Sequence, residues 1–178
     1  MEIENTFIPG LKLIHLKEFI DNRGSFIKVF NADFFAETGL ETNFKESYYS
    51  TSHKNVIRGM HFQIPPFEHT KLVYLNKGKI IDVVLDVRKS SPTYGQHFSI
   101  ELSTENPISI YIPVGCAHGF LSLDDHTMVT YMQTSCYNNA CDKGINYNSF
   151  GMTWGIENPI MSERDLSFPD FLKTNFNF

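Results

Sequence analysis

The chain has 178 residues, which is enough for one domain with a substantial core, and it contains 16 Phe and 8 Tyr. A formal net charge of −5 argues against nucleic acid or an anionic membrane surface as its partner. No apolar stretch approaches the roughly 20 residues of a membrane-spanning helix, and the start, Met-Glu-Ile-Glu-Asn, does not resemble a signal peptide. We therefore expect a single cytoplasmic domain covering residues 1–178.

Most of the predicted elements are short β-strands. In chain order they are expected at residues 25–30, 71–75, 79–87, 95–102, 108–112 and 128–132. Turns rich in Gly, Pro, Asn and Asp separate them, which is typical of an antiparallel sandwich or barrel. The many aromatic rings favour a wide core between two packed sheets. The sequence therefore predicts an all-β fold, most simply a jelly roll.

Two local predictions refine this outline. The strands at 71–75 and 79–87 are joined by Asn-Lys-Gly, a turn sequence that predicts a hairpin. Residues 33–39 form the best helix candidate, with Asn31 or Asp33 as its N-cap and Gly39 at its end. The C-terminal segment is expected to contain turns and one short helical turn.

The segment 58–66, Arg-Gly-Met-His-Phe-Gln-Ile-Pro-Pro, contains the best candidate for a catalytic residue. An isolated His such as His61 is more often structural, but its ordinary pKa also makes it a general base near neutral pH. A carboxylate that accepts its other N–H would fix the tautomer and raise the basicity. The residues alone leave four partners open, namely Asp82, Asp86, Asp142 and Asp165.

Other side chains supply the remaining parts of proton-transfer chemistry. Tyr131 is a candidate proton donor, and Lys71 can stabilise the oxyanion that forms next to a carbonyl. The chain has no Gly-rich phosphate loop, so Arg23 and Arg58 are the candidates for binding phosphate. The ordinary alternatives are a solvated strand end for Lys71, a core ring for Tyr131 and surface ion pairs for the arginines.

A metal site is not favoured by the histidine spacing. Residues 113–118, Pro-Val-Gly-Cys-Ala-His, resemble the second half-motif of the cupins, in which the His binds metal. The first half-motif requires His-x-His, and this chain has His61-Phe-Gln63. We therefore predict no metal, and His118 is either a packed histidine or a substrate contact. The three cysteines, at 116, 136 and 141, are expected to be free thiols, buried or half-buried.

With these residues in view, the chain resembles the dTDP-4-dehydrorhamnose 3,5-epimerase family over about residues 8–169. The matching segments are 19–26, 55–63, 65–66, 71–73, 82–88, 91–95, 102–103, 112–120, 131–134 and 162–165. The sharpest are Arg-Gly-Met-His-Phe-Gln at 58–63 and Ala-His-Gly-Phe at 117–120. The resemblance implies a cupin-type jelly roll with a few short helices, a homodimer, and an isomerase that needs no metal or organic cofactor.

The resemblance also implies a role for each site residue. The substrate would be a nucleotide-linked 4-keto-6-deoxy sugar, made for a surface polysaccharide. His61 would be the base, Asp165 its partner, Lys71 the group that stabilises the enolate, and Tyr131 the proton donor. The implied substrate-binding residues are Arg23, Phe26, Lys28, Glu46, Tyr48, Arg58, Gln63, His118, Tyr137 and Asp142.

The chain departs from the family pattern at a few of these positions. Family members typically have Gln-x-Asn-x-Ser where this chain has Glu46, Tyr48 and Ser50, and an acidic residue where it has Lys28. Cys136 occupies a position where an aromatic ring is common. We hypothesise a compensating Lys28–Glu46 ion pair, and the nucleotide (dTDP, CDP, GDP or UDP) stays open. A single-centre epimerase and a ketoisomerase are the main alternatives; a metal cupin or a non-catalytic sugar-binding module is less favoured.

Overall fold

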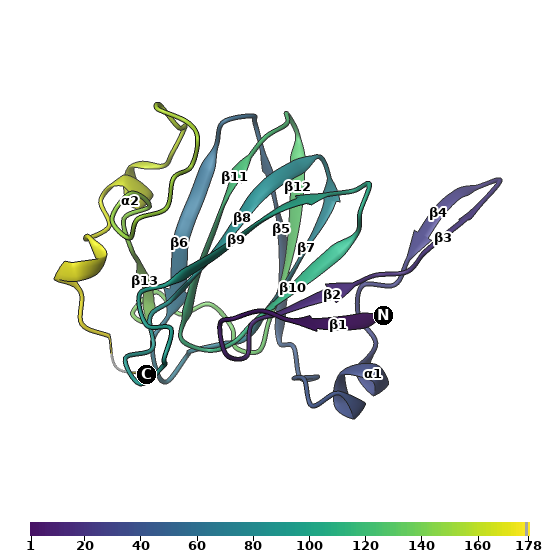
Figure 1. The fold of residues 1–178 in the computed structure, drawn as a ribbon, viewed down its shortest axis with the longest axis horizontal. Coiled ribbons are helices and arrows are strands. Elements are labelled where there is room, and N and C mark those ends of the chain that lie inside the picture. The colour runs from purple at the N-terminus through teal and green to yellow at the C-terminus, as the bar shows by residue number, and fades with distance from the viewer. Residues whose placement is uncertain (177) are drawn as a thin grey trace.

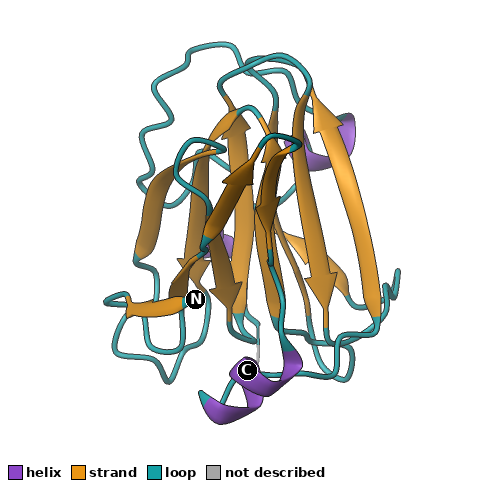
Figure 2. Cartoon of the chain, turned by 90° about the vertical axis from the view of Figure 1, so that its right-hand side faces the viewer, coloured by secondary structure: helices purple, strands orange, loops and turns teal. Residues whose placement is uncertain are grey.

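Two antiparallel sheets face each other in the computed structural model, which describes residues 1–176 and 178 (Figures 1 and 2). The first sheet runs, from edge to edge, through β1 (Glu2–Asn5), β2 (Lys12–His15), β10 (Ile108–Ile112), β7 (Lys71–Lys77), β12 (Thr127–Gln133) and β5 (Glu46–Ser52). The second runs through β13 (Asp142–Gly144), β6 (Ile57–Gln63), β11 (Cys116–Ser122), β8 (Lys79–Asp86) and β9 (His97–Ser103). The predicted all-β jelly roll is confirmed.

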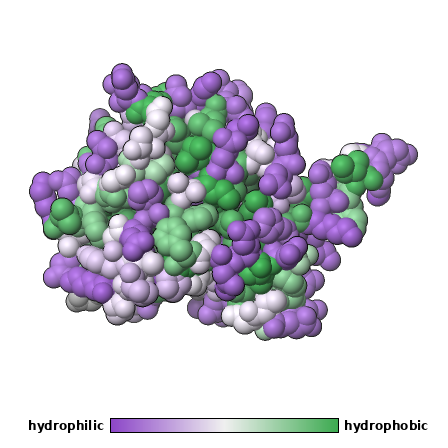
Figure 3. All heavy atoms as spheres, viewed as in Figure 1, coloured by the Kyte–Doolittle hydropathy of each residue, from purple (hydrophilic) through white to green (hydrophobic). Residues whose placement is uncertain are grey.

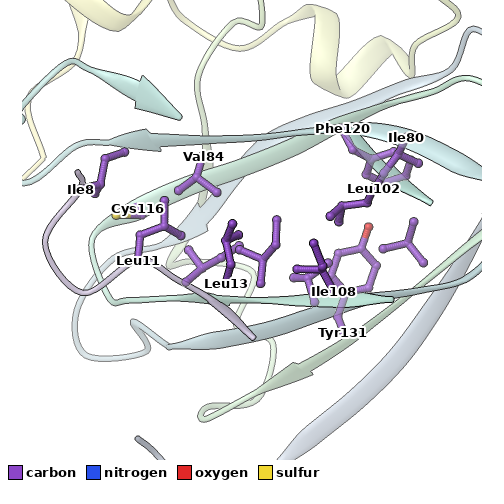
Figure 4. Packing of buried hydrophobic residues seen from close by; sticks show 14 residues of the cluster. Ile8, Leu11, Leu13, Ile80, Val84, Leu102, Ile108, Cys116, Phe120 and Tyr131 are labelled. Atoms are coloured by element: carbon purple, nitrogen blue, oxygen red, sulfur yellow. The ribbon is translucent and has the colours of Figure 1, made fainter. Parts of the chain in front are cut away.

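The core between the sheets follows from the alternation of side chains along each strand. Val73 and Ile110 of the first sheet belong to the same buried cluster as Val84 of the second, so they point between the sheets. Figure 4 draws this cluster. Their neighbours Leu72 and Tyr111 point the other way and pack under α1 (Ala32–Glu37). The first sheet therefore buries apolar residues on both of its faces.

The C-terminal segment covers the outer face of the second sheet. Val83 and Leu85 of β8 point outward and join a cluster with Trp154, beneath the segment that carries α2 (Glu163–Leu166) and η1 (Phe171–Lys173). This packing brings α2 against β6. A segment from the end of the chain is thereby held beside the strand that carries the candidate base.

The helix prediction is confirmed, and the structure selects its cap. Asn31 is the N-cap of α1, and its Oδ1 accepts a hydrogen bond from the backbone N–H of Phe34 at 2.9 Å. The helix ends before Gly39, which has a φ of 71°.

The predicted hairpin of β7 and β8 is wrong. β7 pairs with β10 and β12 in the first sheet, whereas β8 pairs with β9 and β11 in the second. Gly78 lies between them with a φ of 86°, and a Cβ there would lie 2.6 Å from the Oγ1 of Thr127. The same turn residues occur in a hairpin and in a corner where the chain passes from one sheet to the other. The Asn-Lys-Gly sequence therefore does not distinguish the two structures.

A two-stranded arm projects from the body of the molecule (Figure 1). It consists of β3 (Glu18–Asp21) and β4 (Gly24–Ile27), which is shorter than the strand predicted at 25–30. Phe19, Ile20 and Phe26 on this arm are exposed, and Figure 3 shows apolar atoms on its surface. An isolated hairpin is only marginally stable in water, so this arm is short of packing within its own chain.

All three cysteines are free, as predicted, but Cys136 is exposed rather than buried or half-buried. It lies in the surface segment between β12 and β13, whereas Cys116 and Cys141 are buried. Within residues 1–176 and 178, no helix has the length and apolar character to cross a membrane. A cytoplasmic location stays a prediction.

The close approach of β6 and β11 gives a stability prediction. Gly59 has a φ of 134°, and a Cβ there would lie 2.5 Å from the Cα of Gly119 and 2.9 Å from the carbonyl oxygen of His118. We expect Gly59→Ala to lower the free energy of unfolding by about 3 kcal/mol, measured by urea denaturation. Gly39→Ala, also at positive φ but with nothing within 4 Å, should cost about 1 kcal/mol. Equal losses in the two variants would contradict the steric explanation.

Candidate active site

A cavity of about 330 Å³ opens between the two sheets. This volume is in the range of small-molecule binding sites. Its walls are formed by side chains from β5, β7 and β12 of one sheet and from β6 and β11 of the other. The predicted residues that line it are Glu46, Tyr48, Arg58, His61, Gln63, Lys71, His118, Tyr131, Tyr137 and Asp142.

A hydrogen bond joins His61 to Asp165 at the site. Nε2 of His61 lies 2.9 Å from Oδ1 of Asp165, and the other carboxylate oxygen accepts the backbone N–H of Gly59 at 3.1 Å. Ser162 caps α2 by accepting the N–H of Asp165, which fixes where the carboxylate points. Burial alone would raise the pKa of Asp165, but these hydrogen bonds hold it below its usual range.

This contact decides which nitrogen of His61 is free. Because the carboxylate of Asp165 is ionised, it accepts the Nε2–H, and the lone pair of the neutral ring is on Nδ1. The His61 side chain is 30% exposed and lines the cavity, while its ring packs edge-on against Phe168 at 5.6 Å. His61 therefore has the orientation and the partner of a general base.

A second buried pair lies beside the first. His118 on β11 is opposite His61 on β6, so the two imidazoles share the inner face of the second sheet. Nε2 of His118 donates to Oδ2 of Asp82 at 2.8 Å, and both side chains are almost completely buried. The pairing holds His118 in one orientation against the cavity.

The two other candidate carboxylates have cationic partners. Asp86 is buried and pairs with Arg88 at 2.8 Å, away from the cavity. Asp142 lines the cavity and pairs with Arg164, which is next to Asp165 in the sequence. The four Asp residues that the sequence left open thus have four different partners, and only Asp165 is bonded to His61.

Lys71 lies on β7, in the opposite sheet from His61. Its Nζ donates to the backbone carbonyl of His61 at 3.1 Å, and its side chain is buried. Burial lowers the pKa of this ammonium group from an ordinary value of 10.5 to about 8, although the negative charges of Asp142 and Asp82 oppose the change. The ammonium group of Lys71 faces the cavity, and most of its N–H donors stay available to a ligand.

Tyr131 projects from β12 in the same sheet as Lys71. Its ring meets the edge of His118 across the gap, at 5.9 Å between centroids, and stacks on Tyr48 at 4.8 Å. Burial raises the pKa of Tyr131, so its hydroxyl keeps its proton and is available as a donor. The two histidines thus approach the cavity from one sheet, and Tyr131 and Lys71 approach it from the other.

Arg58 and Gln63 flank the catalytic candidates on β6. The Arg58 side chain donates to the Oγ of Ser52 and to the carbonyl of Thr51, both at 3.0 Å, which ties β6 to the first sheet. Gln63 accepts the backbone N–H of Asn138 at 2.6 Å. That bond positions the loop on which the exposed ring of Tyr137 borders the cavity.

The lining residues that were not predicted as site residues are Ser50, Phe62, His69, Gln133 and Arg164. Arg164 precedes Asp165 in the segment 162–165, so its position next to a predicted catalytic residue could have identified it. His69 was considered only for metal spacing. Burial and the charge of Lys71 lower the pKa of His69 to about 3, so it is neutral. Gln133 follows Tyr131 by two residues, and strand alternation alone would have placed it on the same face.

Four predicted residues do not line this cavity, and one of them, Asp165, is joined to it through His61. Arg23 and Phe26 are on the projecting arm, where Arg23 pairs with Asp21 at 2.6 Å. Lys28 lies beside Asn31 at the base of the arm. The hypothesised Lys28–Glu46 pair is wrong for contacts within one chain, because Glu46 instead accepts the backbone N–H of Tyr137 at 2.7 Å.

The donor set does not fit a metal centre. No group of three or more His, Cys, Asp or Glu side chains among residues 1–176 and 178 is arranged to hold a metal ion. His61 and His118, the two histidines of the cupin-like segments, each engage one ring nitrogen with a carboxylate instead.

Comparison with known proteins identifies the family. The family model of dTDP-4-dehydrorhamnose 3,5-epimerases matches residues 5–173. The chain is 35% identical over 179 residues to a dTDP-4-dehydrorhamnose 3,5-epimerase of Shigella flexneri, covering 99% of each chain. This chain belongs to the dTDP-4-dehydrorhamnose 3,5-epimerase family.

Solved structures agree with the family assignment. A dTDP-6-deoxy-D-glucose-3,5-epimerase from Legionella pneumophila, in complex with dTDP-4-keto-L-rhamnose, matches with a TM-score of 0.92 and 32% identity, over 98% of this chain and 94% of that one. A 3'-monoepimerase from Streptomyces bikiniensis, in complex with dTDP-quinovose, matches with a TM-score of 0.88 and 27% identity, over 94% and 86%. The fold of this epimerase family thus occurs with more than one stereochemical outcome.

Burial of Lys71 predicts a stability that depends on pH. Its pKa is lower in the folded chain than in the unfolded chain, so the unfolded chain binds more protons between about pH 8 and 10.5, and stability rises with pH across that window. Lys71→Met removes the buried charge but leaves the carbonyl of His61 without its donor. We expect the variant to be more stable than the wild type by about 2 kcal/mol at pH 7, and the difference to shrink by pH 10.

Urea denaturation of both proteins at the two pH values measures this. Lys77→Met, at the exposed end of the same strand, is the matched control because its ammonium group stays in water. A difference between Lys71→Met and the wild type that is constant from pH 7 to 10 would contradict a buried ammonium group.

Proposed function

We propose that this chain is a cofactor-independent epimerase of a dTDP-linked 4-keto-6-deoxy sugar and inverts both C3 and C5. Family membership supports the substrate and reaction class. The observation that carries the residue roles is the placement of His61 with Asp165 on one sheet and of Tyr131 on the other, around one cavity. Inversion needs a base and an acid on opposite faces of the same carbon.

The chemistry follows from the keto group at C4, which acidifies the hydrogens on C3 and C5. Nδ1 of His61 takes the proton, and the C–H electron pair forms the carbon–carbon double bond of an enolate as the carbonyl π pair moves to oxygen. The ammonium group of Lys71 stabilises that oxygen, and burial strengthens the interaction. Tyr131 then gives its proton to the opposite face as the carbonyl re-forms. Its phenolate is reprotonated from solvent, and the imidazolium of His61 loses the abstracted proton to solvent. Asp165 stabilises the imidazolium of His61 throughout.

Two alternatives share this cavity. A ketoisomerase moves the carbonyl and can shuttle a proton on one face, so an acid on the opposite sheet favours inversion instead. A single-centre epimerase needs the same two groups, and the Streptomyces bikiniensis neighbour has that activity. Incubation with dTDP-4-keto-6-deoxyglucose in D₂O, followed by NMR, separates them. Deuterium at both C3 and C5 of an inverted product supports the proposal; deuterium at C3 alone or a 3-keto product overturns it.

The roles of the base and the acid predict different losses. His61→Ala should lower proton exchange at both carbons by about 10³-fold or more, because it removes the proposed base. Tyr131→Phe should keep exchange but lower the yield of inverted product by about 10²-fold, because reprotonation from the opposite face is lost. The measurement is NMR of the substrate and product in D₂O, with circular dichroism to check folding. Unchanged turnover in His61→Ala would refute the mechanism.

We further propose a homodimer in which the arm of each subunit reaches the cavity of the other. Arg23 and Phe26 are expected to bind substrate by the family resemblance, yet they lie on an arm that does not line the cavity of its own chain. The exposed apolar residues of that arm also require cover. A second copy supplies the cover, and the Arg23 guanidinium group then binds the diphosphate of the substrate on its partner's cavity.

Subunit mixing tests this proposal. Arg23→Ala and His61→Ala are each expected to be nearly inactive as pure proteins. If Arg23 acts on the partner's cavity, a dimer of one variant with the other has one intact site, formed by the His61 of the first and the Arg23 of the second. Random exchange of equal amounts should therefore restore about a quarter of the wild-type activity. No recovery, after mass spectrometry has verified that mixed dimers formed, would show that Arg23 does not act between subunits.

A further inference from the structure

Tyr48 and Tyr131 form a stacked pair at the edge of the first sheet. They are directly opposite each other on β5 and β12, which pair in antiparallel register. Their ring centroids are 4.8 Å apart and the ring planes differ by 19°. Both rings line the cavity. The contact is a cross-strand pair, so its geometry is set by the backbone of the sheet.

The stack restricts the ring of Tyr131. One of its faces is covered by Tyr48, and His118 meets it from the opposite sheet at 5.9 Å. Tyr131 is 7% exposed, whereas Tyr48 is 43% exposed. Tyr48 is therefore the outer member of the pair, between the ring of Tyr131 and solvent. Removing its ring leaves Tyr131 open on the side that faces the edge of the sheet.

We propose that Tyr48 is a positioning residue that aims the hydroxyl of Tyr131 at the face of the substrate opposite His61. This inference rests on the proposed function. The enolate has two fates: His61 can return a proton to the original face, or Tyr131 can deliver one to the other face. The alignment of Tyr131 affects only the second fate, so Tyr48 controls how often proton removal ends in inversion.

Tyr48 lies on β5, the edge strand of the first sheet, so its ring extends towards solvent without displacing another strand. A ligand contact alone would not require the two rings to be nearly parallel.

The experiment compares three substitutions in D₂O with dTDP-4-keto-6-deoxyglucose as substrate. Tyr48→Leu removes the aromatic ring, Tyr48→Phe keeps the ring without the hydroxyl, and Tyr49→Leu is the matched control. Tyr49 is the next residue of the same strand, is exposed and does not line the cavity. The readout is the ratio of inverted product to recovered substrate that has gained deuterium, measured by NMR at saturating substrate.

We expect the ratio to fall roughly three- to tenfold in Tyr48→Leu, which is the size of effect that loss of an aromatic pair produces. The initial rate of proton removal should change much less. Tyr48→Phe should keep a ratio close to that of the wild type, and so should Tyr49→Leu. Tyr48→Met, which is flexible and of similar length, is the second variant if Tyr48→Leu does not fold, and it should lower the ratio in the same direction.

Each contrary outcome is distinct. A raised KM with an unchanged ratio in Tyr48→Leu would mean that Tyr48 only binds substrate, and this would overturn the inference. A fall in Tyr48→Phe as large as that in Tyr48→Leu would assign the effect to the hydroxyl and would also overturn it. Absence of any exchange in the wild-type protein would overturn the proposed function itself, together with this inference.

Discussion

The hydrogen bond between His61 and Asp165 is the interaction on which the site depends, because it joins residues 104 positions apart. It requires the C-terminal segment to pack across the outer face of the second sheet and α2 to lie against β6. The same carboxylate accepts the N–H of Gly59, so it fixes the backbone of β6 as well as the imidazole. The packing of the C-terminal segment therefore also sets the orientation of His61.

The cavity and the core are built by the same alternation of side chains on facing strands. Val73 and Ile110 point between the sheets and exclude water, and Lys71 and Tyr131 point between the same sheets where the layer opens into the cavity. Burying a charge is unfavourable unless it is paired. The charged groups are accordingly paired, or in the case of Lys71 have a lowered pKa. The stability lost at the site is offset by the apolar part of the sandwich.

The sequence was sufficient for the class of fold and for most of the cavity, and insufficient for long-range pairing. Strand periodicity and turn residues are local signals, so they placed the strands; they did not reveal that Gly78 turns the chain into the other sheet. His61, Lys71 and Tyr131 were candidates from their chemistry, but the choice of Asp165 over Asp82 required the family resemblance. The position of Arg23 on a projecting arm depends on tertiary geometry, for which residue type carries no signal.

The residues of the site are divided between interior strands and one edge strand. His61, His118, Lys71 and Tyr131 lie on β6, β11, β7 and β12, which have a neighbouring strand on each side. Glu46 and Tyr48 lie on β5, an edge strand with one neighbour. A change on an interior strand disturbs two ladders and the packing of both sheets, whereas a change on an edge strand disturbs one. An edge strand that borders the cavity can therefore alter how the substrate and the acid are held while the base and its carboxylate stay fixed.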